Sequence, residues 1–293
     1  MPQAEGAPDA VTKTGLFARL IKVEHSVYAL PFAYAGAFLA ADGMPTWSQL
    51  AWITVAMVGA RSAAMALNRL IDAGIDARNP RTAEREIPSG RLGRREVWVF
   101  TLVSTALLVL AAFNLSPPCR YLWPIPLAAF VLYPYTKRFT WACHYFLGLT
   151  LGLAPAAAWV AVTGTVAPQA WLLFFAVGLW VGGFDVIYAI FDLDFDRAHG
   201  LHSVPVAVGE RGALVVAAAS HLVTIALLAA VGSLSGLGPS YWAGLAVVAV
   251  VLAWPHLDIA RRGLRAAGMG FMSVNGAVGL LYGVVVVVSV LLG

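Results

Sequence analysis

Hydrophobic and polar positions follow one another along this chain in long blocks, and the blocks predict membrane-spanning helices. A bilayer core about 30 Å thick needs a helix of about 20 apolar residues. Nine apolar runs reach or approach that length, at residues 26–41, 47–67, 97–115, 119–135, 141–163, 169–191, 212–236, 240–257 and 271–292. The pattern predicts an all-α polytopic membrane protein whose nine transmembrane helices form one bundle around a central cavity.

The amino-terminal end differs from the rest of the chain in being polar. Residues 1–15 contain no apolar core, so they do not resemble a cleaved signal peptide. We expect residues 1–15 to form a disordered cytoplasmic tail. Residues 16–293 are then expected to form a single transmembrane domain.

The fourth run is the least regular of the nine, because five prolines crowd it: Pro117, Pro118, Pro124, Pro126 and Pro134. The distribution of basic residues supports it as a crossing. If all nine runs cross and the amino terminus is cytoplasmic, all but Arg61 and Arg120 of the 19 Lys and Arg residues lie in cytoplasmic segments. We therefore expect an integral protein of a bacterial inner membrane, with its amino terminus inside and its carboxyl terminus outside.

Composition and charge agree with a membrane protein. The chain has 293 residues, of which 60% are hydrophobic and 12% charged, and its mean hydropathy is +0.79. A net charge of +4 could indicate a nucleic-acid partner, but the topology accounts for where the basic residues fall. We expect contact with membrane lipid and no nucleic-acid partner. No feature of the sequence sets an oligomeric state.

The first polar motif follows the second apolar run. Asn68, Asp72 and Asp76 are spaced by four residues. On a helix of 3.6 residues per turn, such a spacing drifts by only about 40° per step. One amide and two carboxylates therefore share one helix face.

A second acidic motif ends the sixth run. Asp192 and Asp196 are four residues apart, and Asp185 lies seven residues before Asp192, close to the same face. The helix turns Asp194 roughly 200° away from Asp192. The topology places both motifs at the cytoplasmic ends of their helices, so we expect them to share one cation site.

Oxygen ligands without His or Cys favour a hard cation such as Mg²⁺, which keeps waters and accepts phosphate oxygens. Basic and phenolic side chains near the motifs supply donors for a diphosphate: Arg61, Arg81, Arg85, Tyr133 and Lys137. Charged groups at membrane depth are expensive, which favours a functional site. The combination predicts a metal-bound isoprenoid diphosphate whose tail lies between helices.

These motifs resemble those of the UbiA family of intramembrane aromatic prenyltransferases. The resemblance lies in NRLIDAGID at 68–76, YPYTK at 133–137 and the DxxxD pattern at 192–196. It covers the first six predicted helices, including LIKVEHSVYALPFAYAGAF, and is one of hydropathy alone after about residue 212. Within the family, the second motif looks most like that of 4-hydroxybenzoate polyprenyltransferases and of the naphthoate prenyltransferases of menaquinone synthesis.

The resemblance implies a role for each matching residue. Asn68, Asp72 and Asp76 would hold one Mg²⁺ and Asp192 and Asp196 a second, with Asp185 nearby. Arg81, Arg85, Tyr133 and Lys137 would stabilise the leaving diphosphate. Arg61 would lie beside the diphosphate or the carboxylate of the aromatic acceptor.

The implied reaction is Mg²⁺-dependent transfer of a polyprenyl group, through an allylic cation, to an aromatic acid in quinone synthesis. The expected acceptor is 4-hydroxybenzoate, and a naphthoate of menaquinone synthesis is the alternative. A membrane cation or proton carrier is an alternative of another class, because intramembrane acids also serve ion paths. Against a carrier, the predicted charges lie at one helix end rather than near the midplane.

Overall fold

The computed structural model describes residues 12–21, 23–267 and 270–292, and within these ranges the regular elements are helices. The elements are α1 (Lys13–Ile21), α2 (Val23–Ala41), α3 (Trp47–Asp76), α4 (Arg94–Phe113), α5 (Cys119–Leu122), α6 (Pro124–Thr136), α7 (Cys143–Thr163), α8 (Pro168–Ala189), the 3₁₀ helix η1 (Ile190–Asp192), α9 (Leu193–Ala198), α10 (Val204–Leu234), α11 (Pro239–Arg262), α12 (Leu264–Ala267) and α13 (Phe271–Leu292). The expected all-α class is confirmed.

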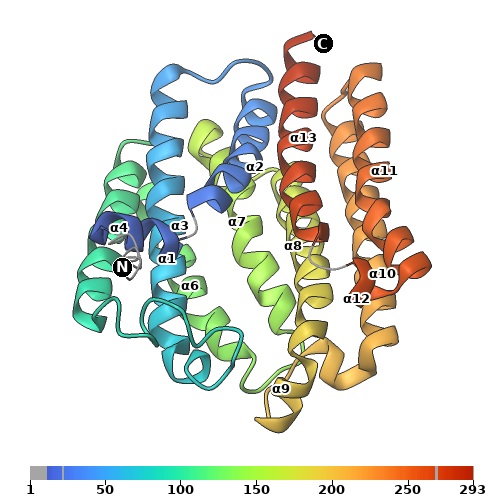
Figure 1. Ribbon diagram of the computed structural model, residues 1–293. Helices are drawn as coiled ribbons and strands as arrows, with labels where there is room; N and C mark the ends of the chain where they lie inside the picture. Colours follow the sequence, from blue (N-terminus) through green and yellow to red (C-terminus); the bar gives the residue numbers. More distant parts are fainter. Residues whose placement is uncertain (1–11, 22, 268–269, 293) are drawn as a thin grey trace, which may run out of the picture.

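The long helices stand side by side in one bundle (Figure 1). The helix α8 packs against α7 on one side and α10 on another, and its apolar stretch is the most buried of the long helices. Buried side chains from α2, α8, α10, α11 and α13 form the largest apolar cluster, which includes Trp180, Tyr241 and Tyr282. The core of the bundle therefore surrounds the helix that leads to the second acidic motif.

Eight of the nine predicted runs correspond to one long helix each, and the fourth corresponds to two shorter ones. Within the described ranges, seven helices are long and apolar enough to cross a membrane: α3, α4, α7, α8 with its continuation, α10, α11 and α13. The described apolar part of α2 is shorter, at Leu30–Ala41. The proline-rich fourth run is split into α5 and α6, the latter of 13 residues. Nine complete crossings thus remain a prediction.

Close packing of α7 on α8 depends on glycine. A Cβ on Gly148 would lie 2.0 Å from the carbonyl oxygen of Gly178, and one on Gly152 would lie 2.2 Å from that of Phe174. Contacts this short leave no room for a side chain. Small residues at such positions let two membrane helices approach closely. This approach holds α8, the helix that leads to the second motif, against α7.

The amino-terminal region is only partly described. The predicted disordered tail, 1–15, lies mostly outside the described residues, but α1 begins at Lys13, so its last three residues are helical. The helix packs through Leu16 and Leu20 against α3 and α4, and Lys13 pairs with Glu96 at 2.5 Å. The chain from Lys13 is therefore tied to the bundle.

The segment after the second motif is more helical than the pattern predicts. The run expected to begin at residue 212 belongs to α10, which begins at Val204, with the Ser203 hydroxyl accepting a hydrogen bond from the Val206 backbone. Gly209 interrupts the helix with φ 73° and ψ 174°. Because that conformation is essentially limited to glycine, hydropathy alone did not reveal that the helix continues on both sides of it.

Candidate functional site

The first motif lies on an uninterrupted helix. The helix α3 has 30 residues, begins with a capping box between Thr46 and Gln49, and runs to Asp76. At 1.5 Å per residue it is about 45 Å long, which exceeds a bilayer core of about 30 Å. Its last turns therefore reach the membrane boundary. The carboxylates of Asp72 and Asp76 are only 5% and 6% exposed there.

Two basic side chains lie beside the carboxylate of Asp72. The Nζ of Lys137, at the end of α6, lies 2.7 Å from Asp72 Oδ2, and the amide of Asn68 donates to the same oxygen at 3.1 Å. The guanidinium of Arg138 lies 3.7 Å from Asp72 Oδ1. The spacing of four in the first motif is thus confirmed as one helix face, and the residues after Pro134 meet that face.

The loop between α3 and α4 folds back over the end of α3. The Thr82 hydroxyl donates to the carbonyl of Asp76 at 3.0 Å, and backbone turns run from Asn79 to Ser89. This path brings Arg85 Nη1 to 2.8 Å from both carboxylate oxygens of Asp76. The loop is therefore a structural part of the site.

Another arginine of this loop reaches the second motif. Arg81 contacts Asp192 through Nε at 2.9 Å and Nη2 at 2.5 Å, and Asn79 donates to the same carboxylate at 3.3 Å. Burial lowers the pKa of the Arg81 guanidinium, but its hydrogen bonds with Asp192 and the charge of that carboxylate outweigh burial, so the pKa lies above its usual value. A charged Arg81 joins the two motifs, which confirms that they meet at one end of the bundle (Figure 1).

The second motif does not continue α8 as a regular helix. A 3₁₀ turn ends at Asp192, and α9 begins at Leu193, so the expected continuous face from Asp185 to Asp196 is wrong. Asp196 still interacts electrostatically with Asp192 and Lys137. Asp194 is exposed.

Tyr133 and Arg61 lie deeper than the acids that end the helices. Tyr133 interacts electrostatically with Asp72, Arg61 and Asp185, so it connects α6 to both motif helices. The Nε of Arg61 is buried without a hydrogen-bond partner among the described residues. An unpaired buried donor favours an acceptor supplied by a ligand, because leaving it unsatisfied is costly.

Sequence reasoning missed four contributors to the site. His144 of α7 lies 2.6 Å from Asp185 through Nδ1 and is 6% exposed. Tyr188 accepts a hydrogen bond from Arg81 and lies under its guanidinium, Asn79 supports Asp192, and the buried Arg69 interacts with Asp76. The only signal for His144 was its place near YPYTK in the chain, since its partner is 41 residues away.

The acid and amide oxygens fit a hard cation with few protein ligands. Asp72 Oδ1 is buried and accepts no hydrogen bond from the described residues, so a lone pair is available. Within the described ranges, no three His, Cys, Asp or Glu side chains gather in a metal-binding group. Each motif therefore offers at most two carboxylates, and Asn68 adds an amide oxygen. Such an open donor set suits Mg²⁺, which usually keeps waters or takes phosphate oxygens.

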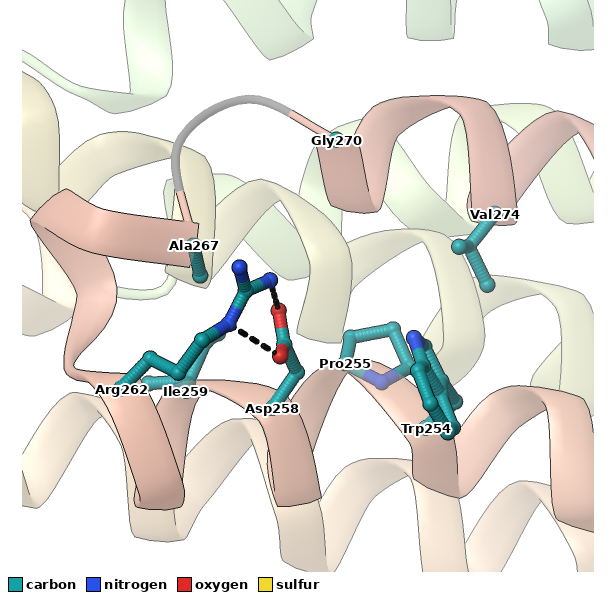
Figure 2. A pocket seen from close by; sticks show the side chains of 8 residues that line it. All are labelled: Trp254, Pro255, Asp258, Ile259, Arg262, Ala267, Gly270 and Val274. Atoms are coloured by element: carbon teal, nitrogen blue, oxygen red, sulfur yellow. Dashed lines mark hydrogen bonds and ion pairs between the residues drawn. The ribbon is translucent and has the colours of Figure 1, made fainter.

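A separate cavity of about 170 Å³ lies between α11, α12 and α13 (Figure 2). Its charged groups satisfy each other, because Arg262 Nε donates to Asp258 Oδ1 at 2.6 Å and a second bond joins the same pair. None of the predicted site residues lines it. We therefore place the functional site at the acidic motifs.

Comparison with known proteins decides the family. The profile of the UbiA prenyltransferase family matches residues 29–290. The chain belongs to this family. A 4-hydroxybenzoate octaprenyltransferase of Aliivibrio fischeri (strain ATCC 700601 / ES114) is 32% identical over 248 residues, covering 84% of this chain and 86% of the relative. A 4-hydroxybenzoate octaprenyltransferase of Acidovorax ebreus (strain TPSY) is 35% identical over 224 residues, which are 75% of this chain and 76% of the relative. Membership of the UbiA family favours a prenyltransferase over an ion carrier.

Solved structures agree with the fold of this UbiA family member. The apo structure of a UbiA homolog from Aeropyrum pernix K1 has a TM-score of 0.83 and 34% identity, covering 91% of this chain and 98% of that chain. A UbiA homolog from Archaeoglobus fulgidus bound to DMAPP and Mg²⁺ has a TM-score of 0.66 at 18% identity and covers 93% and 99%. The likeness to the second protein supports the fold alone.

Proposed function

We propose that this UbiA family member transfers a polyprenyl group from an isoprenoid diphosphate to 4-hydroxybenzoate, with Mg²⁺, in ubiquinone synthesis. The observation that carries the proposal is the junction of two acidic motifs through Arg81, with Lys137 on Asp72. Relatives at 31% to 35% identity named 4-hydroxybenzoate octaprenyltransferase support the acceptor. The basic residues support an inner-membrane protein with this site on the cytoplasmic side.

The acids would hold the metal and the bases the diphosphate. Asn68, Asp72 and Asp76 provide ligands for one Mg²⁺, and Asp192 and Asp196 for a second. Bound Mg²⁺ would supply positive charge to the diphosphate as it leaves. Arg81, Arg85 and Lys137 now contact the carboxylates of Asp192, Asp76 and Asp72, and they can exchange these partners for phosphate oxygens. Positive groups aimed at developing negative charge are the largest catalytic contribution in most such steps.

The remaining residues would act on the acceptor. When the allylic C–O bond breaks, the cation is attacked by the ring carbon beside the phenolic hydroxyl, and the ring then loses a proton. Asp185 is 29% exposed and interacts with Tyr133, so its carboxylate is available as the proton acceptor. His144 would hold Asp185 in place through its 2.6 Å contact. Arg61 would bind the acceptor carboxylate or the diphosphate.

An acceptor panel tests the proposal. Membranes containing the protein are supplied with labelled polyprenyl diphosphate and either 4-hydroxybenzoate or a dihydroxynaphthoate. We expect prenylated 4-hydroxybenzoate with Mg²⁺ and no product in EDTA. Product from the naphthoate alone would show that the enzyme acts in menaquinone synthesis instead. Ion flux in proteoliposomes without prenyl transfer to either acceptor would refute the enzyme.

A further inference from the structure

A polar cleft of about 400 Å³ opens beside the acidic site, on another flank of α3. Gly74 lines it from the end of α3, Arg78 from the turn after α3, Arg138 from the segment after α6, and Phe195, His199 and Gly200 from α9 and the residues after it. Position 74 is two residues from both Asp72 and Asp76, so it is turned well away from them on the helix. The cleft is therefore a neighbour of the acidic site and does not coincide with it.

The charge of the cleft is positive. Its lining includes two guanidinium groups and no carboxylate. Arg78 Nε donates to the Gly74 carbonyl at 3.1 Å, and within the described ranges Arg78 forms no ion pair. Arg138 Nη2 donates to the Ile71 carbonyl at 3.1 Å. Each of these two guanidinium groups has further N–H donors that are available to an anion.

The walls of the cleft leave room for a small, flat or compact ligand. The rings of Phe195 and His199 stack with centroids 4.0 Å apart and form one aromatic surface. A Cβ built on Gly74 or on Gly200 would meet no atom within 4 Å. A volume of about 400 Å³ suits one small molecule, whereas a polyprenyl tail belongs between the apolar helices.

Arg138 connects the cleft to the acidic site. Its guanidinium lines the cleft and also lies 3.7 Å from Asp72 Oδ1. An oxyanion moving between the aqueous side and the acidic site can therefore pass from Arg78 to Arg138 without losing a cationic partner. Guanidinium forks recognise carboxylate and phosphate oxygens equally well by geometry.

We infer that this cleft is a binding site for a small oxyanion that enters or leaves the acidic site. The inference rests on the proposed function, which has two such oxyanions: the inorganic pyrophosphate released and the carboxylate of the aromatic acceptor. Both share the chemistry that Arg78 and Arg138 recognise. The cleft is thus the aqueous route, separate from the membrane-side entry of the prenyl chain.

Two variants and two matched controls test the cleft. Arg78→Gln removes a cation from the lining, and Gly74→Leu places a side chain in the open space. Arg95→Gln and Ala77→Leu are the controls, because both residues are exposed and neither lines the cleft. In membranes, the inhibition constant of inorganic pyrophosphate and the KM of the aromatic acid are measured for all four.

Arg78→Gln loses a charge-assisted contact and Gly74→Leu fills the space of the ligand, so we expect one of the two constants to rise about tenfold or more in both cleft variants. A higher inhibition constant with unchanged KM identifies pyrophosphate. A higher KM with unchanged inhibition identifies the carboxylate, and a rise in both shows that the ligands share the cleft. Cleft variants that match their controls in both constants overturn the inference.

Direct binding separates failure of the cleft from failure of the proposed reaction. Purified full-length protein in detergent is titrated calorimetrically with inorganic pyrophosphate in EDTA, so that no turnover is needed. Weaker binding by Arg78→Gln than by Arg95→Gln supports the cleft even if no aromatic acid is prenylated. The titration is repeated with 4-hydroxybenzoate, and equal binding of both ligands by the two variants overturns the inference.

Discussion

The two acidic motifs carry similar residues on different backbones. The first lies on the last turns of α3, an unbroken helix of 30 residues, and its two carboxylates are almost fully buried. The second is split between η1 and α9, and Asp192 is 16% exposed. The same DxxxD spacing therefore gives a fixed, buried pair in one region and a more open, jointed pair in the other.

Because of this difference, we expect the two motifs to have different roles. The first motif is held by its helix and by bases from two other segments, Lys137 and Arg85. The second depends on a single loop arginine, Arg81, for its closest charged contact. Disruption of the first should abolish the reaction, whereas disruption of the second should weaken binding of the diphosphate.

The largest expected effect is at Asp72. Asp72→Ala removes a metal oxygen and leaves Lys137 without its partner, so we expect kcat to fall about 10³-fold, the upper range for loss of one charge-stabilising group. Prenyl transfer is measured in membranes at matched protein amounts. The control is Asp194→Ala, which alters an exposed acid between the second-motif pair. Comparable losses in the two variants would contradict the assignment.

The next largest effect is expected at the bridge between the motifs. Arg81→Gln loses the bidentate contact with Asp192, so KM for the prenyl diphosphate should rise about 10- to 100-fold, equivalent to about 1.4 to 2.7 kcal/mol. Arg91→Gln in the same loop is the control, since within the described ranges the Arg91 guanidinium donates hydrogen bonds only to Ser89 and to the Glu84 carbonyl. A change in kcat alone would show that Arg81 does not bind the diphosphate.

The kink at Gly209 in α10, which follows the second motif, can be tested through the stability of the folded protein. Gly209→Ala places a Cβ at φ 73° and ψ 174°, so we expect it to destabilise the folded protein by about 1 to 3 kcal/mol. In the first region, Gly74 is an exposed residue within the regular helix α3, so Gly74→Ala should stabilise the folded protein by about 0.5 to 1 kcal/mol. Thermal unfolding in detergent compares them. Equal and small shifts would show that the kink at Gly209 is not required.

The smallest effect is expected at His144, which acts through Asp185. His144→Gln keeps a donor near Asp185 and should lower kcat about 3- to 10-fold without changing KM for the diphosphate. His144→Phe, which keeps the ring and loses the donor, should lower kcat further. If both variants change only thermal stability, His144 has a packing role and does not position Asp185.

Much of the site was predictable because its spacing is local. Four-residue steps on α3 put Asn68, Asp72 and Asp76 on one face whatever the rest of the chain does. The contacts of Lys137 with Asp72 and of Arg85 with Asp76 join residues that had been singled out as site candidates. His144 and Tyr188 were missed, because their roles come from partners on other helices.

The sequence by itself determined the helical membrane architecture, the family and the face of α3, since these depend on hydropathy and on a fixed helical period. Only the tertiary structure decided that α8 breaks at Asp192, that α10 bends at Gly209 and that Arg81 joins the two motifs. The last of these depends on the loop after α3 reaching a residue more than 100 positions away in the chain. No local pattern encodes such a contact, because its energy arises only when both segments are in place.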